Sequence, residues 1–349
     1  MQGLSQMFAQ RGPLRQRLYV LFGGLVFANF AAWAWALAVF HDKPVLLGSA
    51  VLAYSLGLRH AVDADHIAAI DNSTRKLMQE GQRPVAVGLF FSLGHSAIVV
   101  LMSIAVGFAS AAVSTHFDEL RAVGSIVGTS ASALFLFLLA LFNLLVFLSV
   151  WKSFQALRRG EQISDEDFDL LLSKRGLLSR FFRPVFAMVR RSWHLFFVGM
   201  LFGLGFDTAT EVALFGMSAT QAADGASFGA LLVFPALFTA GMSLVDAADG
   251  ALMLGAYGWA YMKPVRKIYY NLTITAVSVV VALAVGGIET LGLIGDKFDL
   301  HGGFWDVVGA LSENFGLLGY GIIGLFVASW LVSIAIYRLK GFDRLEAKA

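Results

Sequence analysis

The chain has 349 residues, of which 58% are hydrophobic and only 14% are charged. Soluble proteins are about half apolar and about a quarter charged, so this composition, with a mean hydropathy of +0.72, is typical of a polytopic membrane protein and excludes a soluble enzyme, a disordered chain and a nucleic-acid-binding protein. The net charge of +2 indicates no particular partner, and the absence of cysteine excludes disulfides, thiolate metal sites and cysteine nucleophiles.

Apolar runs long enough to cross a bilayer recur along the whole chain. A transmembrane helix needs roughly 20 apolar residues, and backbone groups in hydrocarbon must be satisfied within the helix. The first run is too long for the apolar part of a signal peptide, which spans about 7–15 residues. The sequence therefore predicts an all-α membrane protein with eight transmembrane helices, at approximately 18–40, 46–70, 85–113, 123–151, 194–218, 227–259, 268–292 and 316–337.

The basic residues lie almost entirely on one side of these spans. With the N-terminus in the cytoplasm, 22 of the 26 Lys and Arg residues lie in cytoplasmic segments, three lie in outer loops, and Arg59 lies within the second span. This distribution follows the positive-inside rule, so we predict a multi-pass protein of the cytoplasmic (inner) membrane with both termini cytoplasmic. The longest connection, 152–193, then separates an N-terminal membrane half, 1–151, from a C-terminal membrane half, 194–349, which is compatible with two four-helix halves.

The second span carries a concentration of ionisable residues. Arg59, His60, Asp63, Asp65 and His66 lie within eight consecutive positions, although each charge inside a bilayer costs about 2.5–3.5 kcal/mol. On a regular helix His60, Asp63 and His66 would share one side and Asp65 would point elsewhere; a helix that unwinds near its glycine is the alternative. Histidine nitrogens and carboxylate oxygens bind borderline divalent metals. The pattern predicts a metal site, with a salt-bridge cluster that only fixes helix packing as the alternative.

Two other spans contribute single polar residues. His95 lies about 15 Å from the cytoplasmic edge of the third span, at about 1.5 Å per residue, which is close to the middle of the bilayer. This depth favours a role as a metal ligand or proton relay over a helix-to-helix hydrogen bond. Asn29 in the first span either lends an amide oxygen to the metal or hydrogen-bonds across helices.

Pairs of carboxylates occur in the fifth and sixth spans. Asp207 and Glu211 are four residues apart and Asp246 and Asp249 are three apart, so each pair shares one helix face. Two carboxylates on one intramembrane face repel each other unless a cation or a proton lies between them. We predict that these pairs line the path of a cation, with an ion pair between the fifth-span carboxylates and Arg59 as the alternative.

Four segments resemble the signatures of the nickel/cobalt transporter family of secondary permeases. They are Arg59–Ile67 (RHAVDADHI), Phe90–Val99 (FFSLGHSAIV), Leu204–Glu211 (LGFDTATE) and Phe234–Gly250 (FPALFTAGMSLVDAADG). The resemblance implies eight spans and high-affinity uptake of Ni²⁺ or Co²⁺. It implies that His60, Asp65 and His66 are essential, that Asn29 assists metal selection, and that Asp63, His95, Asp207, Glu211, Asp246 and Asp249 belong to functional motifs. Ala247 departs from the family, which often has threonine there.

We therefore predict a secondary transporter that imports nickel, cobalt or both through an intramembrane His/Asp site. The expected partners are the metal ion, as substrate, and the lipid bilayer, with no cofactor and no nucleic acid. The chain has no G-x-x-x-x-G-K-[ST] phosphate loop, so it should not hydrolyse ATP itself, and we expect no ATPase subunit. The alternative is an intramembrane metal-dependent enzyme, which would keep one coordination position open. A proton or sodium antiporter would explain the aspartates but not the paired histidines.

Overall fold

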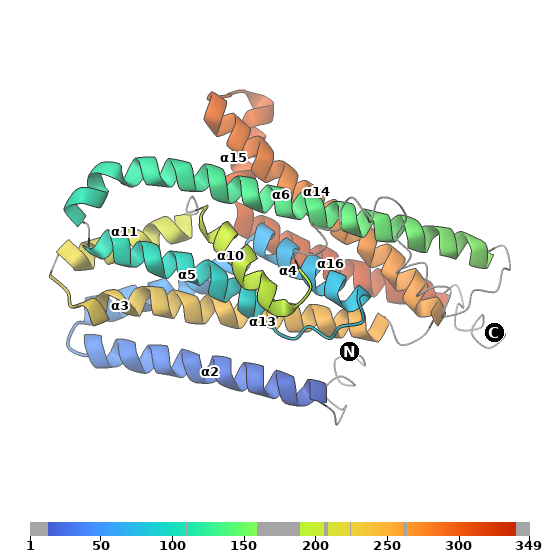
Figure 1. Ribbon diagram of the computed structural model, residues 1–349, viewed down its shortest axis with the longest axis horizontal. Helices are drawn as coiled ribbons and strands as arrows, with labels where there is room; N and C mark the ends of the chain where they lie inside the picture. Colours follow the sequence, from blue (N-terminus) through green and yellow to red (C-terminus); the bar gives the residue numbers. More distant parts are fainter. Residues whose placement is uncertain are drawn as a thin grey trace.

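The computed structural model of the chain describes residues 13–108, 110–158, 189–205, 209–223, 225–260 and 264–339, and all regular structure in these residues is helical. Figure 1 shows long helices lying side by side along the longest axis of the molecule. In chain order they are α2 (Pro13–Phe40), α3 (Pro44–His60), α4 (Ala64–Gln79), α5 (Val87–Phe108), α6 (Ser110–Arg158), η1 (Ser192–His194), α10 (Leu195–Gly203), α11 (Ala209–Ala223), α12 (Phe228–Leu231), α13 (Val233–Ala260), α14 (Pro264–Phe298), α15 (Gly303–Glu313) and α16 (Phe315–Leu339).

The structure does not confirm the predicted number of membrane spans. In the part of the chain that the structure describes, six helices are long and apolar enough to cross a membrane, or seven if the bent pair α3 and α4 is one span. The predicted eight spans are not confirmed. The difference arises at 46–70, where α3 and α4 form the bent pair, and at 194–218, where the described residues form the 9-residue α10 and the 15-residue α11. Neither helix alone reaches the roughly 20 residues that a span requires.

The predicted second span is interrupted inside the bundle. α3 ends at His60 and α4 begins at Ala64, with a bend of 51° between the two helices. Asp63 directly before α4 has an extended backbone, with φ −63° and ψ 147°. The chain thus adopts the unwound alternative, at 61–63 rather than at Gly57. Two helix ends therefore lie inside the fold, and backbone N–H groups of residues 61–63 donate to the last carbonyls of α3.

Helix α4 lies in the middle of the bundle (Figure 1), where it packs on α5, α6, α13, α14 and α16. Of its 16 residues 13 are buried, and the buried set includes every residue of the polar run 71–76. The predicted span ended at residue 70, so this polar continuation was not predicted to lie in the core. Polar residues at membrane depth are costly and usually serve function.

Two glycines bring α10 directly against α5. A Cβ atom at Gly199 would overlap the carbonyl oxygen of Phe91, and a Cβ atom at Gly203 would lie 2.8 Å from the carbonyl oxygen of His95. Small residues four positions apart permit this close approach between membrane helices. The crossing fixes the position of His95 in the core.

Candidate metal centre

The structure brings together three buried histidines from three helices. His60 ends α3, His66 lies in the first turn of α4, and His95 lies in α5. One ring nitrogen from each residue lies within 4.8 Å of the other two, and the ring centroids are 4.7–4.9 Å apart. Metal–imidazole bonds are about 2.0–2.1 Å long, so two ligands of one ion are at most about 4.2 Å apart. A small movement of the rings would therefore place all three nitrogens around one divalent ion.

The Nδ1 atoms of two of these rings lie within hydrogen-bond distance of oxygen atoms. His60 Nδ1 lies 3.0 Å from Asp63 Oδ2 and 3.1 Å from Thr210 Oγ1. His66 Nδ1 lies 3.3 Å from Asp246 Oδ2. A carboxylate that accepts from Nδ1–H orients the ring and leaves the Nε2 lone pair available for a metal. His66 Nε2 is indeed buried and bonded to no described residue.

The third ring makes a different set of contacts. His95 Nε2 lies 2.9 Å from His60 Nε2 and 2.9 Å from Glu211 Oε1, while its Nδ1 is buried and bonded to no described residue. Two ring nitrogens at this separation must share a proton, because two lone pairs would repel each other. Metal binding requires deprotonated ligands and releases such a proton. The contact between His60 and His95 is thus a place where a divalent cation can replace a proton.

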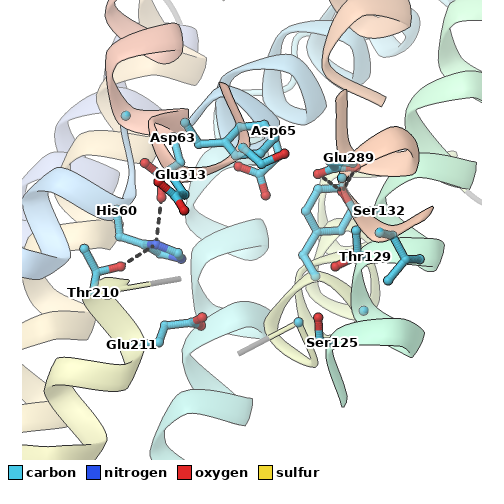
Figure 2. Close-up of a pocket in the computed structure, with 18 of the residues that line it drawn as sticks. His60, Asp63, Asp65, Ser125, Thr129, Ser132, Thr210, Glu211, Glu289 and Glu313 are labelled. Carbon is cyan, nitrogen blue, oxygen red and sulfur yellow. Dashed lines mark hydrogen bonds and ion pairs between the residues drawn. The ribbon is translucent and has the colours of Figure 1, made fainter. Parts of the chain in front are cut away.

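A cavity of about 540 Å³ opens onto His60 and His95. Figure 2 shows Asp63 beside His60, Asp65 nearby, and Glu289 with Ser132 on the opposite wall. Six water molecules occupy about 180 Å³, at about 30 Å³ each, so the cavity can admit a hydrated ion. Carboxylates predominate in its wall and attract cations. The charged lining residues are Arg59, Asp63, Asp65, Glu211, Glu289, Asp296 and Glu313.

Among the described residues, two predicted site residues, Asn29 and Asp249, are not brought to this centre. The Asn29 carboxamide accepts a hydrogen bond from Tyr54 at 2.9 Å and donates one to the Ala240 carbonyl at 3.3 Å, which favours the helix-to-helix alternative. Asp249 lies one helical turn after Asp246, whose carboxylate contacts His66. The Asp249 Oδ2 atom is buried and makes no hydrogen bond to a described residue. Asp207 lies outside the described residues.

Sequence reasoning missed other polar groups at the cavity. Glu289 of α14 is 7% exposed, and its two oxygens accept from Ser132 Oγ of α6 at 2.8 and 2.9 Å. The sequence could have indicated Glu289 as a site residue, because it lies inside an apolar run and charged residues within membrane spans usually serve function. Thr210 gave no such signal, because hydroxyls in membrane helices commonly bond to their own backbone.

Together these features define a polytopic membrane protein with a buried three-histidine centre that opens onto a carboxylate-lined cavity. Residues 46–336 match the family described as high-affinity nickel-transport protein, and the chain belongs to this family. It is 57% identical over 338 residues to the high-affinity nickel transport protein of Cupriavidus necator, covering 97% of this chain and 96% of that one.

Two further relatives extend the comparison to cobalt and to other organisms. The high-affinity nickel-transport protein NixA of Helicobacter pylori is 44% identical over 315 residues, which are 89% of this chain and 94% of that one. The cobalt transport protein NhlF of Rhodococcus rhodochrous is 38% identical over 333 residues, which are 93% and 94% of the two chains. No solved structure matches the chain. The family and these relatives are transporters rather than enzymes, as the sequence predicted.

Asp246→Asn should lower the affinity for nickel about 10- to 100-fold, the usual effect of removing a carboxylate that orients a ligating histidine. Asparagine keeps the shape of Asp246 but removes the charge that accepts from His66 Nδ1. Equilibrium nickel binding to purified protein measures the effect. Asp296→Asn, at an exposed residue of the cavity wall, is the matched control. Equal affinities for the two variants would contradict the orienting role.

Proposed function

We propose that this protein is a secondary transporter that imports nickel, cobalt or both across the cytoplasmic membrane, with the ion bound in transit by His60, His66 and His95. The observation that carries this proposal is the convergence of three buried imidazoles at the break between α3 and α4. Imidazole suits these metals, and broken membrane helices form the binding sites of many transporters. Family membership and the transport activities for which the relatives are named support the same conclusion.

The other polar residues divide into two roles in this proposal. Asp63 and Asp246 orient His60 and His66 through the Nδ1 contacts described above. Glu211 lies beside His95 Nε2, where its carboxylate faces the same position as the ion. Asp65 and Glu289 line the cavity and attract the hydrated ion before the histidines replace its water. Metal contacts by Asn29 and Asp207 stay predictions.

The direction of transport follows from the distribution of basic residues. The cavity is lined by Asp296, Ser312 and Glu313, which belong to the segment that the positive-inside rule places outside the cell. An ion would thus enter the centre from the outside. Moving two charges inward yields about 4.6 kcal/mol per 100 mV of membrane potential, which is about three orders of magnitude in concentration. The inner membrane, the cytoplasmic termini and the division at 152–193 remain predictions.

Uptake by reconstituted protein tests the proposal. Proteoliposomes that contain the purified full chain would be given radioactive nickel or cobalt, with and without an inside-negative potassium diffusion potential. We expect accumulation of at least one metal, increased by the potential, and none in protein-free liposomes. The ratio of the two isotopes gives the preferred ion. No uptake of either metal by folded protein would overturn the proposed function.

A further inference from the structure

The buried polar part of α4 continues well beyond the histidines. The cavity wall includes Asp65, but no described residue further along α4. Arg75 lies nine residues after His66, about 14 Å along the helix at about 1.5 Å per residue. Its side chain is 1% exposed, and Asp71 one turn before it is fully buried. A guanidinium and a carboxylate thus lie inside the bundle, on the side of the histidines away from the cavity.

These two residues join three helices through one hydrogen-bond network. Arg75 of α4 donates from Nη2 to Tyr257 of α13 at 2.7 Å and to Ser278 of α14 at 2.6 Å, and from Nη1 to Thr275 of α14 at 3.1 Å. Ser278 donates to Asp71 Oδ2 at 2.7 Å, and the Tyr257 hydroxyl donates to Asp71 Oδ1. Arg75 Nη2 also lies 3.8 Å from Asp71 Oδ1. We call these five residues the Arg75 network.

The interface between α4 and α13 extends from the metal centre to this network. His66 contacts Asp246 at the centre, and Arg75 contacts Tyr257 eleven residues further along α13. Asp249 lies between these two contacts, one turn after Asp246. Its Oδ2 is buried and bonded to no described residue. A cation that leaves His66 along this interface would meet Asp249 first and the Arg75 network next.

We propose that the interface of α4 with α13 and α14 is the inner gate of the transport path, and that the Arg75 network holds it closed. This inference rests on the proposed function, because it takes the end of α4 as the cytoplasmic side. The guanidinium repels a divalent cation while it remains on the path, and its hydrogen bonds to Tyr257, Ser278 and Thr275 tie α4 to both neighbouring helices. Separation of α4 from α13 and α14 breaks the network and leaves a route past Asp249 to the cytoplasm.

Single-cysteine reporters can test the gate, because the chain contains no cysteine. Met253→Cys places an inner reporter four residues from both Asp249 and Tyr257, on their face of α13. Ser125→Cys places an outer reporter in the cavity wall. Each would be combined with Arg75→Gln, which removes the charge, or with Tyr257→Phe, which removes only the bridging hydroxyl. Arg83→Gln, at an exposed residue after α4, is the matched control.

Membrane-impermeant thiol reagents, applied to inside-out and right-side-out vesicles, would report the rate of modification at each cysteine. We expect Arg75→Gln to raise the rate at Met253→Cys from the cytoplasmic side about tenfold or more, and Tyr257→Phe to raise it less. The rate at Ser125→Cys from the outside should fall at the same time, and Arg83→Gln should change neither rate. The assay needs no metal, so it is independent of the uptake experiment.

Two outcomes would overturn the gate. An unchanged rate at Met253→Cys would show that the network does not close the path. A raised rate at Met253→Cys with an unchanged rate at Ser125→Cys would show that the substitution only loosens local packing, because a gate must couple the two ends of the path. A melting temperature of each purified variant close to that of the unmodified protein shows that the variants are folded.

Discussion

His66→Ala should abolish high-affinity nickel binding and nickel uptake, with a loss of affinity greater than about 100-fold. Loss of a partner that merely orients a ligand costs about 10- to 100-fold, and this substitution removes one of the three nitrogens that converge in the described part of the chain. It also leaves Asp246 buried in the core without its imidazole partner. Equilibrium binding to purified protein gives the affinity, and X-ray absorption at the nickel edge gives the number of nitrogen ligands.

His301→Ala is the matched control for this experiment. His301 is exposed and pairs with Asp299, far along the chain from the metal centre. The control should bind and transport nickel like the unmodified protein. If folded protein with His66→Ala kept the original affinity and the same number of nitrogen ligands, the three-histidine centre would be wrong.

Gly319→Ala should destabilise the protein and damage the metal centre together. A Cβ atom at Gly319 of α16 would overlap the carbonyl oxygen of Val62, in the break between the two helices that carry His60 and His66. Backbone cannot move aside as a side chain can, and overpacking of this kind costs about 1–3 kcal/mol or more. We expect a lower melting temperature of the purified protein and a weaker affinity for nickel.

Gly321→Ala is the control on the same helix, because a Cβ atom there meets nothing within 4 Å. It should leave the melting temperature and the affinity close to their original values. Equal behaviour of the two variants would show that the contact between α16 and the break does not support the centre.

The sequence predicted well those elements that depend on local composition. The runs that became α2, α14 and α16 are long and apolar, so their lengths alone identify them. The break at 61–63 could not be placed, because Ala-Val-Asp contains neither proline nor glycine. Its position depends on a tertiary contact, the approach of Gly319 to Val62 across 257 residues of sequence.

The candidate site was predictable in its residues but not in their roles. Charged and imidazole side chains in apolar runs are rare enough that His60, His66 and His95 attract attention by themselves. Asp246 was predicted to line the path of the cation, and the structure adds a contact that the sequence did not indicate, with the Nδ1 of His66. Arg75 resembled a solvated helix end because its neighbours in sequence are polar. Its partners come from α13 and α14, which no local pattern indicates.

The break between α3 and α4 has a mechanical consequence for ion release. His60 and His66 lie on opposite sides of the 51° bend, so a metal ion bound to both acts as a cross-link over a hinge. Straightening or closing the bend changes the distance between the two nitrogens, and a metal–imidazole bond tolerates little stretching. A rotation of α4 therefore removes one ligand from the ion without any change in the chemistry of the ligand. The same rotation that would open a route to the cytoplasm thus also weakens the binding of the metal ion.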